Sequence, residues 1–144
     1  MFYLDLSGTI QDMVSTDFTS TWSSGNIGNY NFKAPLVQGI GMDVLQNANY
    51  GIGQTGGGLR LYVANPEGLI QEYGYDTQTD WWVSGYAFPE SNGYGGVGGE
   101  LRYDNVTTLY LLNKNSKLEY WWRDWGENST FPSGSWNKGN FDPI

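Results

Sequence analysis

The sequence contains no cysteine and no histidine. These absences exclude disulfides, zinc sites of the Cys/His type and nucleophiles activated by histidine. Without cysteine, the sequence does not indicate whether the protein resides in an oxidising or a reducing compartment. Only carboxylate and carbonyl oxygens remain as metal ligands, which suit calcium, and no loop has the spacing of an EF-hand. We therefore expect no metal and no cofactor.

Basic residues are scarce as well, with 7 Lys and Arg against 15 Asp and Glu and a net charge of −8. Nucleic acids and anionic membrane surfaces are bound by clustered basic side chains, so neither is an expected partner. No apolar run reaches the ~18 residues of a membrane-spanning helix. The first five residues lack the basic and apolar regions of a signal peptide, which leaves the localisation open.

Glycine and aromatic residues are abundant, at 21 residues and 17% respectively. Together they favour short strands joined by tight turns, whereas Ala, Glu and Lys are too sparse for a helical protein. No stretch of a dozen residues shows apolar residues at helical spacing. The composition therefore predicts an all-β protein.

Three short sequence elements recur in the same order three times. Copies of Trp-x-x-Gly begin at Trp22, Trp82 and Trp136. Before each Trp lies a turn followed by an apolar residue, in segments that begin at Gly8, Gly68 and Ser116. A strand-like element precedes each turn: Phe2-Tyr3-Leu4, Leu61-Tyr62-Val63 and Leu109-Tyr110-Leu111. Such order indicates an internal repeat.

Each copy is predicted to form strand, turn, strand, loop and strand, and a further strand precedes two of them, over residues 36–45 and 97–103. Four short antiparallel strands in ~40–60 residues describe a blade of a β-propeller. We place the blade units at residues 1–27, 34–90 and 96–144, which is about two and a half to three blades and no closed ring. Further copies of the chain or a partner chain are expected to complete the ring, or the sequence is a fragment of a longer protein.

The segment from Leu59 to Gly85 contains Leu59-Arg60-Leu61-Tyr62, Gly68-Leu69-Ile70-Gln71-Glu72, Asp76 and Trp82-Val83-Ser84-Gly85. This pattern resembles that of the fucose-binding β-propeller lectins of fungi and bacteria. It implies a sugar pocket between neighbouring blades. Arg60 and Glu72 would form its polar pair, Trp136 of the next unit an aromatic wall, and Tyr86 a residue facing the pocket. Trp82 would serve the preceding pocket, and bacterial members, with two blades per chain, trimerise into one ring.

The other two units depart from this pattern. The position of the arginine is occupied by Met1 and Thr108, and that of the glutamate by Asp12 and Tyr120. A second tryptophan of the family aligns with Tyr75 in the second unit and with Arg123 in the third. The chain therefore has at most one complete polar pair.

The chemistry of these residues suits a sugar. Arg60 offers two parallel donors, ionised Glu72 accepts from two adjacent hydroxyls, and an indole covers the apolar face of the ring. Antiparallel strands joined by a turn would place Arg60 and Glu72 on one face, within ~5–8 Å of each other. The alternative is an ion pair with no ligand.

Most tryptophans are expected to pack in the core. Trp81-Trp82 and Trp121-Trp122 are neighbours within strands, so one member of each pair should be buried and the other partly exposed.

Two other functions stay open: a structural propeller fragment that acts through its interfaces, and a glycosidase subunit. Glycosidases need two carboxylates at a fixed separation, and no pair is singled out among Asp12, Asp76, Asp80, Asp104 and Asp124. We therefore expect a binding protein and not an enzyme. The sequons at Asn105 and Asn128 are of the frequency expected by chance.

Overall fold

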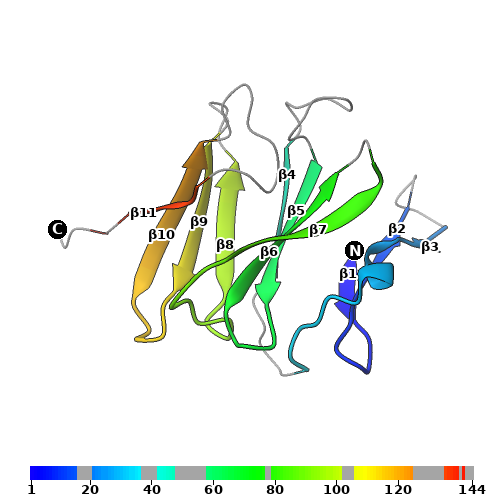
Figure 1. Ribbon diagram of the computed structural model, residues 1–144, viewed down its shortest axis with the longest axis horizontal. Coiled ribbons are helices and arrows are strands. Elements are labelled where there is room, and N and C mark those ends of the chain that lie inside the picture. The colour runs from blue at the N-terminus through cyan, green and yellow to red at the C-terminus, as the bar shows by residue number, and fades with distance from the viewer. Residues whose placement is uncertain are drawn as a thin grey trace. The chain divides into compact units, whose positions relative to one another are not determined.

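The computed structural model confirms the all-β prediction (Figure 1). Its described residues form eleven strands and one short 3-10 helix, η1 (Ile27–Tyr30), and the strands make three antiparallel sheets. No helix among these residues is long and apolar enough to cross a membrane. The described residues are 1–15, 21–36, 42–47, 58–76, 79–101, 106–124, 135–139 and 141.

The first compact unit, Met1–Gln38, contains a three-stranded sheet in the order β1-β2-β3. In the β1–β2 hairpin, Phe2 lies opposite Asp12, and Met1 and Met13 exchange two backbone hydrogen bonds of 2.9 and 2.8 Å. The strands are β1 (Phe2–Leu4), β2 (Ile10–Val14) and β3 (Ser23–Ser24).

The second compact unit, Gly39–Ile144, contains two four-stranded sheets, in the orders β4-β5-β6-β7 and β11-β10-β9-β8. Strands β4 and β8, each at one edge of its sheet, lie next to each other. The first sheet is formed by β4 (Met42–Asn47), β5 (Gly58–Ala64), β6 (Ile70–Asp76) and β7 (Trp81–Ala87). The second is formed by β8 (Val97–Leu101), β9 (Val106–Leu112), β10 (Leu118–Asp124) and β11 (Asn137–Gly139).

One hairpin in each sheet has a turn of the same construction. A side-chain oxygen accepts the backbone N–H of the residue four positions later, at 3.0 Å in all three turns; the acceptors are Asp5, Asn65 and Asn113. Three residues after each acceptor the backbone adopts a positive φ, at Gly8, Gly68 and Ser116. This left-handed conformation favours glycine, and Ser116 is the one departure. Since the turns match, the paired strands start in the same register.

This register corrects the alignment of the first unit by one residue. Phe2 lies opposite Asp12 as Tyr62 lies opposite Glu72, so Phe2 is level with Tyr62. Met1 is therefore level with Leu61, and the predicted match of Met1 to the arginine position was wrong. A run of consecutive apolar residues has no alternation from which the register could be predicted. The pairing with β2 fixes it.

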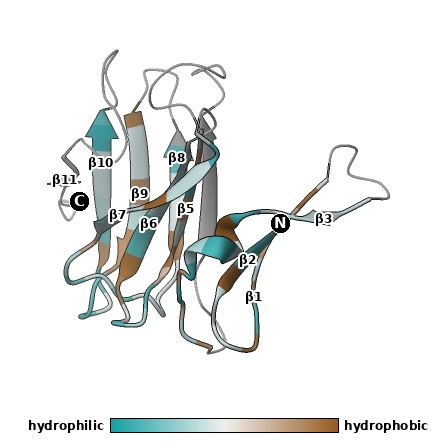
Figure 2. Cartoon of the chain, turned by 45° about the vertical axis from the view of Figure 1, so that its right-hand side comes forward, coloured by the Kyte–Doolittle hydropathy of each residue, from teal (hydrophilic) through white to brown (hydrophobic). Residues whose placement is uncertain are grey.

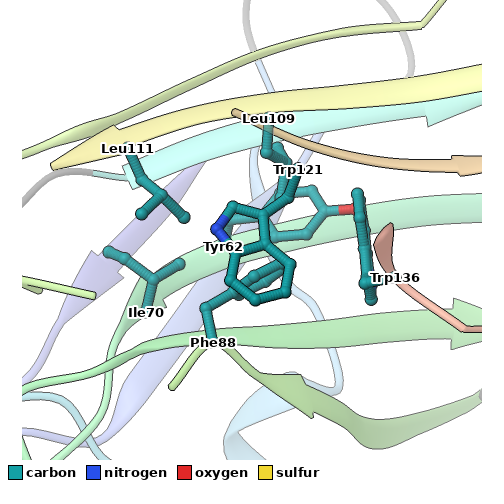
Figure 3. Close-up of a cluster of buried hydrophobic side chains, with 7 residues drawn as sticks. All are labelled: Tyr62, Ile70, Phe88, Leu109, Leu111, Trp121 and Trp136. Atoms are coloured by element: carbon teal, nitrogen blue, oxygen red, sulfur yellow. The ribbon is translucent and has the colours of Figure 1, made fainter. Parts of the chain in front are cut away.

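The core of the second unit lies between its two sheets (Figure 3). Its rings meet edge to face, with centroids 5.0 Å apart for Phe88 and Trp136 and 5.5 Å for Phe88 and Trp121, a favoured aromatic geometry. Figure 2 shows the hydrophobic segments of β6 and β9 that contribute to it. The cluster comprises Tyr62, Ile70, Phe88, Leu109, Leu111, Trp121 and Trp136.

The adjacent tryptophans divide as predicted. Trp82 and Trp121 are 3% and 5% exposed, whereas Trp81 and Trp122 are 63% and 38% exposed. Alternation along each strand therefore sends one indole of each pair into packed protein and the other towards solvent.

Candidate functional site

The centre of the candidate site is the carboxylate of Glu72 on β6, which is fully buried. Tyr62 lies opposite Glu72 on β5, and its hydroxyl donates a hydrogen bond of 3.1 Å to Oε1. The backbone N–H of Tyr86, on β7 of the same sheet, donates to Oε2 at 3.4 Å. Three strands of one sheet thus hold the carboxylate in place.

The neighbouring sheet supplies the charge that balances Glu72. Arg123 on β10 is 1% exposed and approaches with both terminal nitrogens, Nη2 at 3.3 Å from Oε2 and Nη1 at 3.4 Å from Oε1. The indole Nε1 of Trp136 lies 3.5 Å from Oε2, and the guanidinium lies over the Trp136 ring, 4.6 Å from its centroid. The two sheets are therefore connected by a buried, hydrogen-bonded ion pair with an aromatic wall.

Burial raises the pKa of the Tyr62 phenol well above its ordinary value, and the negative charge of Glu72 raises it further. The positive charges of Arg60 and Arg123 act in the opposite direction. The phenol consequently stays protonated at neutral pH and acts as a hydrogen-bond donor to Glu72. Figure 3 shows its hydroxyl directed towards Trp136.

The structure brings together four of the five residues that the sequence suggested. Arg60 lies opposite Gly74, and Gly74 is two residues after Glu72, so Arg60 and Glu72 share one face of the sheet. Arg60 Nη1 donates to the carbonyls of Leu59 and Tyr75, at 3.0 and 3.5 Å. Trp136 contacts the carboxylate directly, as described above.

The other two suggested residues, Tyr86 and Trp82, differ in position. The ring of Tyr86 packs on Phe88 and Trp121, with centroids 5.1 and 6.0 Å apart, while its backbone N–H serves Glu72. Trp82 lies opposite Tyr75, with ring centroids 5.3 Å apart, on the face of the sheet away from Glu72. Trp82 therefore does not belong to the Glu72 site.

Sequence reasoning missed Tyr62 and Arg123 as members of the site. Arg123 was read only as a departure from a tryptophan position. The sequence carried no signal for its burial: Glu119, Trp121 and Arg123 alternate with Leu118, Tyr120 and Trp122, and hydropathy alone favours burial of the second set. The first three are buried, and all face the β4–β7 sheet.

The glycine of Trp-x-x-Gly has a steric reason to be there. A Cβ added to Gly139 would overlap the ring of Tyr120, and one added to Gly25 would overlap the carboxylate of Asp12. Asp12 and Tyr120 occupy the register position that Glu72 has in the β4–β7 sheet. The glycine thus leaves room for the side chain at this position.

A second polar cluster lies on the face of β10 that carries Trp121 and Arg123. Lys138 Nζ is 2.8 Å from Oε1 of Glu119, which also accepts from Asn113 Nδ2 at 2.7 Å. Burial alone raises the pKa of Glu119, but the hydrogen bonds from Lys138 and Asn113 outweigh it and lower the pKa below its ordinary value. Within the described part of the chain, no three acidic side chains gather as metal ligands.

Comparison with known proteins gives one structural likeness. No protein-family model matches the sequence, and no curated protein matches it. The fold is similar to that of a fucose lectin from Kordia zhangzhouensis, solved in complex with methyl-fucoside. The TM-score is 0.52 and the identity 18%, over 99% of this chain and 98% of the lectin chain.

Proposed function

We propose that this chain is a carbohydrate-binding, lectin-like protein whose sheets are blades of a β-propeller, and that it binds fucose or a related sugar. Two observations support the proposal. The fold is similar over nearly the whole chain to that of a fucose lectin, which is a binding protein and not an enzyme. The three hairpins share one turn construction, as expected of repeated blades.

The observation that carries the proposal is the meeting of Glu72 with Arg123 and Trp136 from the neighbouring sheet. A carboxylate that accepts from adjacent hydroxyls, beside an indole that covers an apolar ring face, is suited to a sugar. Arg123 contacts both carboxylate oxygens of Glu72. Sugar hydroxyls would replace the guanidinium of Arg123 as hydrogen-bond donors to Glu72 while the guanidinium moves aside. The carboxylate would therefore keep hydrogen-bond donors on both oxygens throughout. Arg60, on the same face, would supply a further donor.

A glycan array with the purified chain tests this proposal, followed by calorimetric titration with methyl-fucoside. We expect reversible binding without turnover, and its loss in Arg60→Ala. The exposed Lys114 provides a cationic control, because it lies in the turn between β9 and β10 and has no contact with Glu72 among those described. An array without any bound glycan would contradict the proposal.

A second candidate function is a structural propeller segment that binds no sugar. One observation favours it: Glu72 is fully buried, and both of its oxygens already have donors within the chain. In that case the Glu72–Arg123 pair would only connect two sheets. Replacing Glu72 would then lower stability without any glycan binding to lose.

A further inference from the structure

Glu119, Trp121 and Lys138, which we name the Glu119 cluster, repeat the chemistry of the Glu72 site. Each place has a buried carboxylate, a cation that binds it and an indole next to that cation. Lys138 Nζ lies 2.8 Å from Oε1 of Glu119 and 5.7 Å from the centroid of the Trp121 ring. Arg123 makes the same two kinds of contact, with the Glu72 carboxylate and with an indole. A carboxylate beside an indole suits a sugar in both places.

Two polar atoms of the Glu119 cluster are buried without completing a hydrogen bond among the described residues. They are Oε2 of Glu119 and Nε1 of Trp121, on side chains of residues that are 8% and 5% exposed. The indole N–H lies near enough to Glu119 to help lower the pKa of its carboxyl. Figure 3 shows Nε1 on the side of the Trp121 ring away from Trp136. Such a buried acceptor and donor carry a free-energy penalty that a bound group could remove.

A hydroxyl group can satisfy both of these atoms at once. It has one hydrogen to donate to Oε2 of Glu119 and lone pairs that accept from Nε1 of Trp121. An ammonium group can only donate, whereas an ionised carboxylate can only accept and would be repelled by Glu119. The cluster therefore favours a ligand rich in hydroxyls, or a single water molecule.

The Glu119 cluster adjoins the Glu72 site on one face of β10. Glu119, Trp121 and Arg123 are alternate residues of the strand, so Glu119 and Arg123 stand about 13 Å apart with Trp121 between them. Tyr86 connects the two places, because its backbone N–H donates to Glu72 and its ring packs on Trp121, with centroids 6.0 Å apart. One sugar ring is too short to span this separation, whereas two or more joined units can.

Lys138 is the member of the cluster that reaches solvent. Its side chain is 34% exposed, and it belongs to β11, the last strand at one edge of its sheet. A ligand that approaches along this edge would displace Nζ from the Glu119 carboxylate. Asn113 Nδ2, 2.7 Å from Oε1, would remain as a donor to that oxygen. The carboxylate can therefore open towards a ligand without losing every donor that the chain provides.

We infer, on the basis of the proposed function, that the Glu119 cluster binds a further sugar unit of a glycan whose first unit lies at Glu72. The ligand is then an oligosaccharide and not a single sugar. One hydroxyl of the further unit bridges Oε2 of Glu119 and Nε1 of Trp121, while the indole and the stem of Lys138 cover its ring.

Calorimetric titrations of the wild type with two kinds of ligand test this inference. The first is methyl-fucoside, and the second is a set of disaccharides in which fucose is joined to galactose or to N-acetylglucosamine. We expect at least one disaccharide to bind about tenfold or more tightly than methyl-fucoside, because its second unit adds a hydrogen bond to a charged carboxylate. The ratio of the two dissociation constants is the quantity to compare between variants.

Glu119→Gln and Trp121→Phe should bring this ratio close to one. The glutamine places a donor where Oε2 accepts, and the phenylalanine removes the N–H but keeps an aromatic ring. Glu100→Gln is the matched control and should keep the ratio of the wild type. Glu100 is exposed and lies opposite Thr108, which lies opposite Trp122. Its side chain therefore points to the face of the sheet away from Glu119.

Nitrogen-15 NMR of the wild type adds a measurement that needs no stable variant. The Trp121 indole N–H, assigned through the contacts of its ring with Tyr86 and Phe88, should shift with the disaccharide and not with methyl-fucoside. Equal affinities for methyl-fucoside and every disaccharide, or a Trp121 signal that shifts with neither because only water occupies the cluster, would overturn the inference. Methyl-fucoside binding would still support the proposed function in that case. A wild type that binds no glycan would overturn both.

Discussion

Glu72 and Arg123, 51 residues apart in sequence, form a two-pronged ion pair between two sheets, and both side chains are excluded from solvent. Breaking such a pair leaves one buried charge without its counterion. We expect Glu72→Gln or Arg123→Met to lower the free energy of unfolding by about 3–5 kcal/mol, and the double variant to lose less than the sum. Urea denaturation of the wild type, the two single variants and the double variant measures the coupling energy between Glu72 and Arg123.

Glu90→Gln is the control for that cycle. Glu90 is 74% exposed, and its Oε2 lies 3.9 Å from Nζ of Lys138, so it forms only a long, solvent-exposed ion pair. Its effect should stay within about 0.5 kcal/mol. Additive losses in the Glu72 and Arg123 cycle would show that the two side chains do not stabilise the fold as a pair.

The two partners of this ion pair should affect sugar binding in opposite directions. If ligand hydroxyls replace Arg123 at the carboxylate, Arg123→Ala removes a competitor and strengthens binding of methyl-fucoside, whereas Glu72→Gln weakens it. A hydrogen bond to a charged group contributes about 1.5–3 kcal/mol, so each change should exceed about tenfold in Kd. Calorimetric titration measures both. Weaker binding by Arg123→Ala would show that Arg123 contacts the sugar itself.

Local patterns predicted much of the fold. Turn residues such as Asn65 and Gly68 located the hairpins, because a side-chain acceptor and a positive φ define the turn. Alternation predicted that one of Trp121 and Trp122 is buried and the other partly exposed, and the structure buries Trp121. The proximity of Glu72 and Trp136 followed from the family resemblance and is present in the structure.

Non-local contacts were not predicted from the same patterns. The pairing of Arg123 with Glu72 depends on two sheets packing face to face, which no sequence spacing encodes. The predicted register of β1 was wrong for a related reason. Phe2, Tyr3 and Leu4 are all apolar, so only the pairing of Phe2 with Asp12 fixes the register of the strand.

We expect acid to weaken the first hairpin at Asp5. The hydroxyl of Ser7 and the N–H of Thr9 donate to its carboxylate at 2.7 and 3.0 Å and hold the pKa of Asp5 well below its ordinary value. A lowered pKa means that the contribution to stability is present above the ordinary value and is lost as pH falls towards the folded-state pKa. The protection factor of the Thr9 amide, which is its exchange rate relative to the intrinsic rate at the same pH, should therefore fall below about pH 4.

The chain itself supplies the control for Asp5. Asn65 and Asn113 make the same turn with a neutral amide oxygen. Asp5→Asn should keep Thr9 protected and remove the acid dependence, whereas Asp5→Ala should lose the protection at every pH. Equal acid dependence in the wild type and in Asp5→Asn would contradict the assignment.

Gly139 lies opposite Tyr120, and a Cβ at this position would overlap the Tyr120 ring. Gly139→Ala should therefore destabilise the protein by about 1–3 kcal/mol, the range for overpacking, as measured by urea denaturation. Gly98→Ala is the matched control, because a Cβ there meets nothing within 4 Å, and it should be neutral or slightly stabilising. Adding Tyr120→Ser to Gly139→Ala removes the ring that the new methyl group meets, so the alanine should cost much less in that background. An equal loss in both backgrounds would show that the glycine is needed for its backbone and not for the space it leaves.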